Sequence, residues 1–195
     1  MNMKHIAIFA SGNGSNAQAI IEYYKNHSSI KVALVVTNNP DAGVIKIAHQ
    51  HKIISAIVSK EFLGNEEMMN RLLQAQQIEM IVLAGFLQLV PAFLLQKFPN
   101  RVINIHPALL PKHGGKGMYG NKVHEAVLAN KETESGITIH YVNEKYDEGK
   151  VILQKQITVE ANDTIESLAE KIQQLEHEWL PKIIEQLLTP GLTLV

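Results

Sequence analysis

Short apolar segments rich in Ile and Val alternate with longer amphipathic segments from the start of the chain to about residue 130. Such alternation is typical of βα units built around a buried parallel sheet. It predicts strands at 4–10, 31–37, 53–58, 79–84 and 101–105, and helices at about 15–26, 41–51, 65–76, 90–97 and 121–129.

The pattern changes to that of a strand pair from Gly136 onward. Ile137, Ile139 and Tyr141 alternate with polar residues, and a second run, 151–159, follows a short turn. Two strands joined in this way are expected to be antiparallel to each other.

A last helix is predicted to begin near Asp163. Asp163 and Glu166 have the spacing of a capping box, and Pro181 is expected to kink the helix or restart it. Apolar side chains follow one face at helical spacing: Ile165, Leu168, Ile172, Leu175 and Trp179.

These elements predict one α/β domain over residues 1–195, with an open, mostly parallel, twisted Rossmann-like sheet. We expect helices on both faces and antiparallel strands near the C-terminus. In such sheets the ligand crevice lies at the carboxyl ends of the strands. Functional side chains are therefore sought where each strand ends.

Composition narrows the functional classes. Basic and acidic residues number 18 and 19 and are scattered, so we expect no broad basic surface for nucleic acid. Without cysteine the chain has no disulfide or thiolate nucleophile, which suits a cytoplasmic protein. No apolar run approaches the roughly 18 residues that a membrane helix needs, and the first is too short for a secretory signal. We expect a cytoplasmic monomer or homodimer acting on small molecules.

A glycine loop follows the first predicted strand. Gly12, Gly14, Ser15 and Asn16 lie where a helix begins, and free backbone N–H groups there can bind an anion. Gly12-x-Gly14-x-x-Ala17 also fits a dinucleotide fingerprint, but Thr-Asn-Asn at 37–39 replaces the expected acid. The Lys-Ser/Thr pair of a loop that binds a nucleoside triphosphate is missing too. The loop suits a single terminal phosphate, while Ser15 can also serve only as a helix cap.

Polar side chains also end the strand predicted at 101–105, where Asn104 and His106 follow β-branched residues. If the sheet is as predicted, Thr138 and His140 on a neighbouring strand and Asp147 in the next turn converge on them. Each has a structural alternative: a packed core histidine, or a turn residue of the Asp-x-Gly kind.

A metal site is not expected, although the chain has nine histidines. His113, His124 and His140 lack the spacing of metal ligands, and the sequence His124-Glu125 is not followed by a His at the required position. We also expect no nicotinamide or flavin.

Residues 103–111, Ile-Asn-Ile-His-Pro-Ala-Leu-Leu-Pro, resemble the signature of the folate-dependent formyltransferases. The resemblance extends from residue 6 to about 179, and its most specific blocks are 10–16, 82–86, 102–111, 136–142 and 147–154. It implies the formyltransferase fold and transfer of a formyl group from 10-formyltetrahydrofolate to the amine of 5-phosphoribosylglycinamide, a step of purine biosynthesis.

The resemblance also implies roles for the polar set. Asn104 would donate to the developing oxyanion and His106 would act as the general acid. Asp147 would raise the pKa of His106 above its ordinary value and orient a water that carries a proton.

Binding residues are implied as well. Better-known members often carry Arg where Gln88 stands and also near Asn65, so the preferred folate glutamate length stays open. The loop 113–120 is either a mobile lid or an inert surface loop. The phosphoribosylglycinamide set is Gly14, Ser15, Asn16, Gln173 and Glu176. The folate set is Asn65, Leu87, Gln88, Leu89, Val90, Asn104, Asn143, Glu144, Lys145, Tyr146 and Asp147, with His140 and Thr138 as further candidates.

Three other functions fit part of this pattern. A methionyl-tRNA formyltransferase normally carries a further C-terminal domain, and a formyltetrahydrofolate hydrolase an N-terminal regulatory one; we expect neither here. A non-catalytic phosphoribosyl or nucleotide binder would not need Asn104, His106 and Asp147 together.

Overall fold

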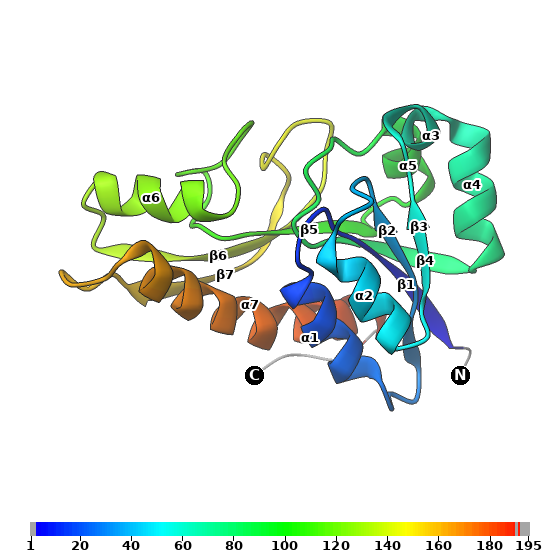
Figure 1. Cartoon of the computed structure of the whole chain (residues 1–195), viewed down its shortest axis with the longest axis horizontal. Coiled ribbons are helices and arrows are strands. Elements are labelled where there is room, and N and C mark those ends of the chain that lie inside the picture. The colour runs from blue at the N-terminus through cyan, green and yellow to red at the C-terminus, as the bar shows by residue number, and fades with distance from the viewer. Residues whose placement is uncertain (1–2, 190, 192–195) are drawn as a thin grey trace.

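The computed structural model describes residues 3–189 and 191, and within them seven strands form one sheet of order β3-β2-β1-β4-β5-β6-β7 (Figure 1). Neighbours among β1 to β5 are parallel, and β6 is antiparallel to both β5 and β7. The strands are β1 (Lys4–Phe9), β2 (Ile30–Thr37), β3 (Ile54–Ile57), β4 (Ile78–Leu83), β5 (Val102–His106), β6 (Glu134–Tyr141) and β7 (Val151–Thr158).

Seven helices connect or follow these strands in the described part of the chain. All predicted helices are present, and one short helix, α3, was not predicted. Its five residues are too few to show a helical period, but Ser59 caps it by accepting from the N–H of Phe62 at 3.1 Å. The helices are α1 (Ser15–Tyr24), α2 (Gly43–Gln50), α3 (Lys60–Gly64), α4 (Glu66–Ala75), α5 (Ala92–Lys97), α6 (Asn121–Ala129) and α7 (Ile165–Leu188).

Helices cover both faces of the sheet, as predicted. Successive side chains of a strand point to opposite faces, so Ile8 and Phe9 of β1 belong to different cores. Ile8 lies in the core that contains Ile20 of α1 and Ile172 of α7. Phe9 lies in the core that contains Met69 of α4, together with residues of α3 and α5. Strands β1, β2, β4 and β5 are thus largely buried on both sides, whereas β3 and β7 are partly exposed.

The cap of α7 differs from the predicted one. Thr164 Oγ1 accepts from the N–H of Ser167 at 3.2 Å, and Ser167 Oγ accepts from the N–H of Thr164 at 2.9 Å. The predicted box of Asp163 and Glu166 is therefore wrong by one position. Asp163 instead accepts from Lys171 at 2.8 Å, and this contact, together with hydrogen bonds from the Glu160 N–H and Ser167 Oγ, lowers its pKa to about 2.

Helix α7 continues through Pro181 without a restart. Proline costs the helix one N–H donor, but Leu180, Ile183 and Ile184 around it are buried in the core. Packing therefore outweighs the lost hydrogen bond, and the predicted restart is wrong. None of the described helices has both the length and the apolar character that a membrane span requires.

Strand order places a crevice between β1 and β4. The chain leaves β1 toward β2 on one side and β4 toward β5 on the other, so the loops after β1 and β4 diverge. This is the switch point at which open α/β sheets bind ligands. The prediction of a single domain over 1–195 stays a prediction, and residues 1–2, 190 and 192–195 lie outside the described part.

Candidate active site

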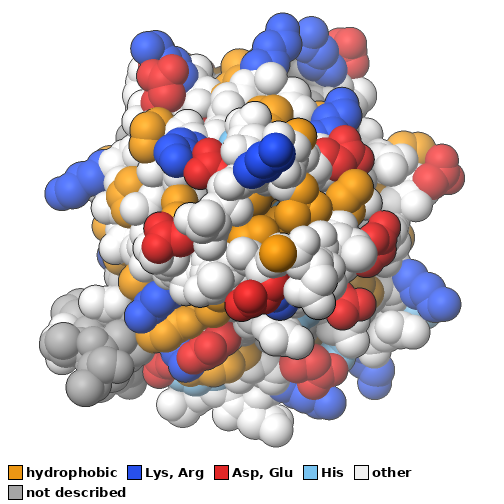
Figure 2. Space-filling model, turned by 90° about the vertical axis from the view of Figure 1, so that its left-hand side faces the viewer, with side chains coloured by type: hydrophobic (Ala, Val, Ile, Leu, Met, Phe, Trp, Pro, Cys, Tyr) orange, Lys and Arg blue, Asp and Glu red, His pale blue; other side chains and the backbone are white. Residues whose placement is uncertain are grey.

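A cavity of about 660 Å³ opens at the carboxyl ends of the parallel strands. Its volume lies in the range of small-molecule sites. Figure 2 shows basic and acidic side chains interspersed over the end of the molecule that carries α6. The cavity is lined by residues 12–16, 83–90, 104–107, 115–121, 124, 140, 142, 145–147, 169, 172, 173 and 176.

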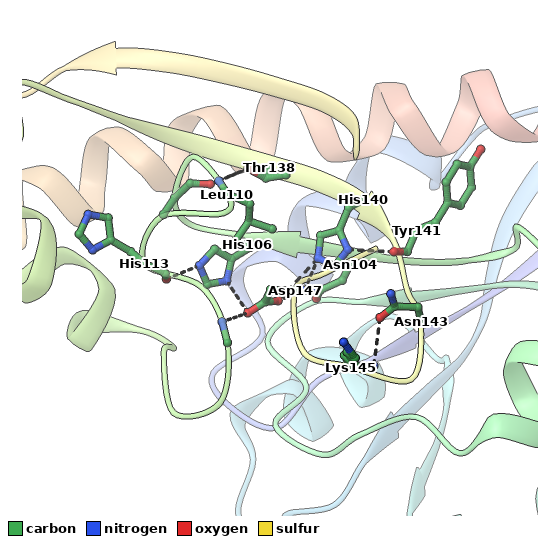
Figure 3. Close-up of polar contacts among 12 residues, drawn as sticks. Asn104, His106, Leu110, His113, Thr138, His140, Tyr141, Asn143, Lys145 and Asp147 are labelled. Atoms are coloured by element: carbon green, nitrogen blue, oxygen red, sulfur yellow. Dashed lines mark hydrogen bonds and ion pairs between the residues drawn. The ribbon is translucent and has the colours of Figure 1, made fainter. Parts of the chain in front are cut away.

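Asn104, His106, His140 and Asp147 meet in this cavity (Figure 3). The antiparallel register places Asn104 opposite His140 across β5 and β6. Asn104 Nδ2 donates to Asp147 Oδ1 at 3.3 Å, and Asp147 Oδ2 lies 3.5 Å from His106 Nδ1. The ring of His140 also faces the carboxylate, with Nε2 3.6 Å from Oδ1. The expected convergence of three separate segments is present.

The β6–β7 turn is shaped so that Asp147 points back at β5. Asp147 has φ 57°, a left-handed conformation that Asp tolerates better than most residues. A Cβ at Gly149 would lie 1.6 Å from the carbonyl oxygen of Tyr141, so only glycine lets the turn pack against β6. Gly115 then fixes the carboxylate by donating its N–H to Oδ2 at 2.9 Å. Asp147 is both a turn residue and a charge partner.

Burial decides the protonation of His106. The residue is 3% exposed, and loss of hydration disfavours its charged form. Burial therefore lowers the pKa of His106, although the Asp147 charge and the His113 carbonyl both act to raise it. Asp147 raises this pKa, as expected, but burial is the larger effect, so the pKa lies below its ordinary value and not above it.

Asp147 itself is held ionised. Burial raises its pKa, but the contact with the His140 ring, the charge of His106 and the Gly115 N–H outweigh burial and lower it. His140 Nδ1 donates to the carbonyl of Tyr141 at 2.9 Å, and His140 Nε2 lies 3.1 Å from Asn104 Nδ2, which itself donates to the Asp147 carboxylate. Asn104 thus has a fixed amide orientation, with its N–H groups directed into the site.

The glycine loop reaches the same cavity from β1. Gly14, not Ser15, is the N-cap of α1, with φ 83° and no side-chain cap bond. The alternative that Ser15 caps the helix is therefore wrong: Ser15 is already its first residue. The backbone N–H groups of the first turn have no side-chain acceptor in the cap, and the loop lines the cavity.

Glu176 of α7 closes this end of the cavity, with Gln173 one turn before it. Asn16 Nδ2 donates to Glu176 Oε2 at 2.9 Å, while Asn16 Oδ1 is buried without a hydrogen-bond partner. Burial raises the pKa of Glu176 to about 7. The Glu176 carboxyl, with a pKa near neutral pH, and the Asn16 amide oxygen, which has no partner, can both accept hydrogen bonds from a polar ligand.

The predicted folate set divides into two groups. Residues 87–90, Lys145 and Tyr146 line the cavity, as do Asn104 and Asp147. Asn65, Asn143 and Glu144 are not among the lining residues, so their binding roles stay predictions.

Three of the predicted residues form hydrogen bonds with backbone groups. Asn65 caps α4 by accepting from the N–H of Met68 at 3.0 Å, and Asn143 accepts from the N–H of Lys145 at 3.0 Å. Thr138 is fully buried and donates to the carbonyl of Ala108 at 2.7 Å. Thr138 therefore holds the backbone of the segment that follows β5.

His124 lines the cavity but was weighed in the sequence only as a metal ligand. It is 5% exposed, its Nδ1 has no partner, and burial lowers its pKa. The available signal was its position beside Val123 on the inner side of α6. In the described chain, no three His, Cys, Asp or Glu side chains gather as a metal site would require.

Comparison with known proteins agrees with this architecture. The family described as Formyl transferase matches residues 4–184. The chain is 41% identical over 188 residues to the chloroplastic phosphoribosylglycinamide formyltransferase of Arabidopsis thaliana, covering 93% of this chain and 64% of that one. It is 38% identical to the phosphoribosylglycinamide formyltransferase of Bacillus subtilis, with 95% of each chain covered. It spans just under two thirds of the Arabidopsis protein and nearly all of the bacterial one.

Solved structures show the same relationship. The crystal structure of phosphoribosylglycinamide formyltransferase from Bacillus halodurans superposes with a TM-score of 0.86 at 36% identity, covering 98% of both chains. Glycinamide ribonucleotide transformylase 1 from Geobacillus kaustophilus gives 0.86 at 34% identity, covering 96% of this chain and 100% of the other. The family matches nearly the whole length of this chain, and the fold is shared with the solved structures. This chain therefore belongs to the formyl transferase family.

Proposed function

We propose that this protein transfers the formyl group of 10-formyltetrahydrofolate to the amine of 5-phosphoribosylglycinamide, giving 5-phosphoribosyl-N-formylglycinamide and tetrahydrofolate. The carrying observation is that Asn104, His106 and Asp147 meet in one cavity with a helix N-terminus suited to phosphate. The relatives that bear this activity in their names support the proposal.

The phosphoribosyl end would lie against the glycine loop. Backbone N–H groups at the start of α1 and the positive end of the helix dipole favour a phosphate. Asn16 and Glu176 at the neighbouring wall offer an amide oxygen and a carboxyl to ribose hydroxyls or to the glycinamide. Gln173 lines the same wall.

The folate end would lie along the segment after β4. Residues 83–90 line the cavity with a largely apolar surface, in which Ala84 and Gly85 leave room for a flat ring. Leu87 and Leu89 are about half exposed before a ligand binds, as expected for side chains that a ring would cover. Lys145 and Tyr146 approach from the opposite turn.

The residues of the site fit the chemistry of formyl transfer. The substrate amine attacks the formyl carbon, the bond from that carbon to the folate nitrogen breaks, and the amine proton passes to that nitrogen. Asn104 Nδ2 and protonated His106 can donate to the formyl oxygen as it gains negative charge, and each such donor is typically worth about 3 kcal/mol. Asp147 stays ionised, favours the charged form of His106 and can orient the water that carries the proton.

An assay of the purified full chain with both substrates tests the proposal. We expect formation of tetrahydrofolate only when phosphoribosylglycinamide is present, and no formylation of methionyl-tRNA added as a competing acceptor. Release of formate without an acceptor would favour a hydrolase, and tight binding without turnover a binding module. Either result would overturn the proposal.

The specificity for phosphate gives a second test of the proposed function. By calorimetry, phosphoribosylglycinamide should bind far more tightly than its dephosphorylated form, and NAD should not compete, because Thr-Asn-Asn at 37–39, and not an acid, stands at the end of β2. We further propose that the cysteine-free chain acts in the cytoplasm as a monomer or homodimer. Sedimentation would distinguish the two assemblies.

A further inference from the structure

His106 is held at both ring nitrogens, and only one of the two partners belongs to the predicted catalytic set. Nε2 lies 2.8 Å from the carbonyl oxygen of His113, while Nδ1 faces Asp147 (Figure 3). A carbonyl oxygen only accepts hydrogen bonds. Nε2 therefore carries a hydrogen in the neutral ring and in the charged ring alike, and Nδ1 is the atom that gains or loses the proton.

The His113 carbonyl is placed by contacts of its own side chain. His113 has φ 54°, in the left-handed region, so its backbone needs support to keep this conformation. Its ring is nearly buried, and Nε2 lies 3.3 Å from Glu132 Oε1. Glu132 belongs to the segment between α6 and β6, where its N–H donates to the carbonyl of Val127 at 3.2 Å. The α6–β6 connection thus anchors the loop at His113.

The second carboxylate oxygen of Glu132 has a different partner. Lys112 Nζ lies 2.9 Å from Oε2 and is well exposed, so this pair contributes little to stability. Hydrogen bonds from Lys112 and His113 lower the pKa of Glu132, which stays ionised. Lys112 offers a matched control because it touches the same carboxylate without touching the His113 ring.

We propose that His113 and Glu132 are positioning residues, which act through the His113 carbonyl to fix the tautomer of His106 and to keep Nδ1 as its proton-transferring atom. This inference rests on the proposed function, in which His106 is the acid. Its physical basis is that the carbonyl and Asp147 hold the ring from two different nitrogens, so orientation and charge are controlled separately. Fixing a reacting group in one geometry lowers the entropic cost of the transition state.

The other charged or titratable groups near His106 act differently. Asp147 from the β6–β7 turn favours the imidazolium, whereas protonated His140 on β6, His113 in the loop and His124 on α6 repel it. Apart from Asp147 and the His113 carbonyl, no described group has a hydrogen bond or ion pair with the ring nitrogens of His106. The His113 carbonyl favours a hydrogen on Nε2 and the Asp147 carboxylate favours one on Nδ1, so weakening the His113 contact should shift the tautomer toward Nδ1–H.

The experiment combines nitrogen NMR of His106 with kinetics in five variants of the full chain. His113→Phe and Glu132→Ala remove the ring-to-carboxylate contact singly, and their double variant removes both partners. Glu132→Gln keeps an acceptor oxygen for the His113 ring, and Lys112→Ala removes only the exposed partner. A His106→Ala spectrum assigns the signal of His106.

We expect the neutral ring to be the Nε2–H tautomer in the unaltered protein, in Glu132→Gln and in Lys112→Ala. In His113→Phe and Glu132→Ala the signal should move toward a mixture of tautomers. The same two variants should lose roughly tenfold in kcat with KM changed less than about twofold, since a reacting group is misplaced while substrate contacts remain. The double variant should be no slower than the slower single variant.

Unchanged tautomer and kcat in His113→Phe would overturn the proposal, as would a multiplicative loss in the double variant or a loss in Lys112→Ala equal to that in Glu132→Ala. Native circular dichroism and thermal unfolding exclude a folding defect as the cause. The nitrogen NMR measurement of His106 does not depend on catalytic turnover. A protein without formyl transfer but with the expected tautomer shift would refute the proposed function alone.

Discussion

The carboxylate of Asp147 lies 3.5 Å from Nδ1 of His106, and a backbone group of the loop 113–120 holds each of the two residues in this arrangement. Gly115 donates to Asp147 and the His113 carbonyl accepts from His106. Burial disfavours the imidazolium while the carboxylate favours it. The acid strength of His106 is thus a balance between two opposing effects, and changes to either are measurable.

His106 and Asp147 are predicted to act as a unit. His106→Ala or Asp147→Asn should each lower kcat by roughly 100-fold or more, because an acid or its charge partner is lost. The double variant should lose less than the product of the two, since the second change removes a partner that is already ineffective. Steady-state kinetics under saturating substrates measure this. Fully multiplicative losses would show that the two residues act independently, and a normal rate in His106→Ala would remove it from the mechanism.

The pH dependence of kcat/KM should report the lowered pKa of His106. Because burial outweighs the Asp147 charge, the acid form should be lost as pH rises through a value below the ordinary 6.5 or so. Asp147→Asn removes a charge that raises this pKa, so the alkaline limb should move to still lower pH.

Glu148→Gln is the matched control for this experiment. The Glu148 carboxylate pairs with Lys145 at 3.0 Å and forms neither a hydrogen bond nor an ion pair with His106. The alkaline limb of the kcat/KM profile of Glu148→Gln should coincide with that of the unaltered protein. An unshifted limb in Asp147→Asn, with chemistry shown to limit the rate, would reduce Asp147 to a turn residue.

Glu176 should make folding stability depend on pH. Its pKa in the folded protein is about 7 against 4.5 when unfolded, so the folded state binds the proton more tightly. The stabilisation is fully present below about pH 4.5 and is lost as pH rises through 7. Relative to Glu176→Gln, the unaltered protein should lose roughly 3 kcal/mol of unfolding free energy between these limits. Urea unfolding at several pH values measures this, and Glu178→Gln, an exposed change on the same helix, should show no such trend.

Gly14→Ala should damage the phosphate loop. An added Cβ would lie 2.8 Å from Val44 Cβ, and φ 83° disfavours any side chain. We expect a loss of about 1–3 kcal/mol in stability and weaker binding of phosphoribosylglycinamide. Gly12→Ala provides the comparison, because no atom lies within 4 Å of its added Cβ. Equal stability of the two variants in thermal unfolding would contradict the close packing of Gly14 against Val44.

The α/β fold could be predicted because its signals are local. Buried strands need apolar β-branched residues, and helices that cover a sheet need an apolar face, so both leave a period in the sequence. The pairing of Thr164 with Ser167 was missed by one residue because neighbouring Asp, Thr and Ser all suit a cap. The predicted restart of α7 at Pro181 was wrong because the packing that keeps the helix continuous comes from residues distant in the sequence.

The sequence by itself determined the strand-helix alternation, the glycine loop at a helix start, and the placement of Asn104 and His106 at the end of a strand. Each depends on neighbours along the chain. The tertiary structure alone decided that burial lowers the pKa of His106 and that Gly14 caps α1. It also decided that the His113 carbonyl reaches the His106 ring and that Glu132 reaches the His113 ring. Desolvation and contacts across long sequence separations depend on which atoms meet in three dimensions, and no local pattern records them.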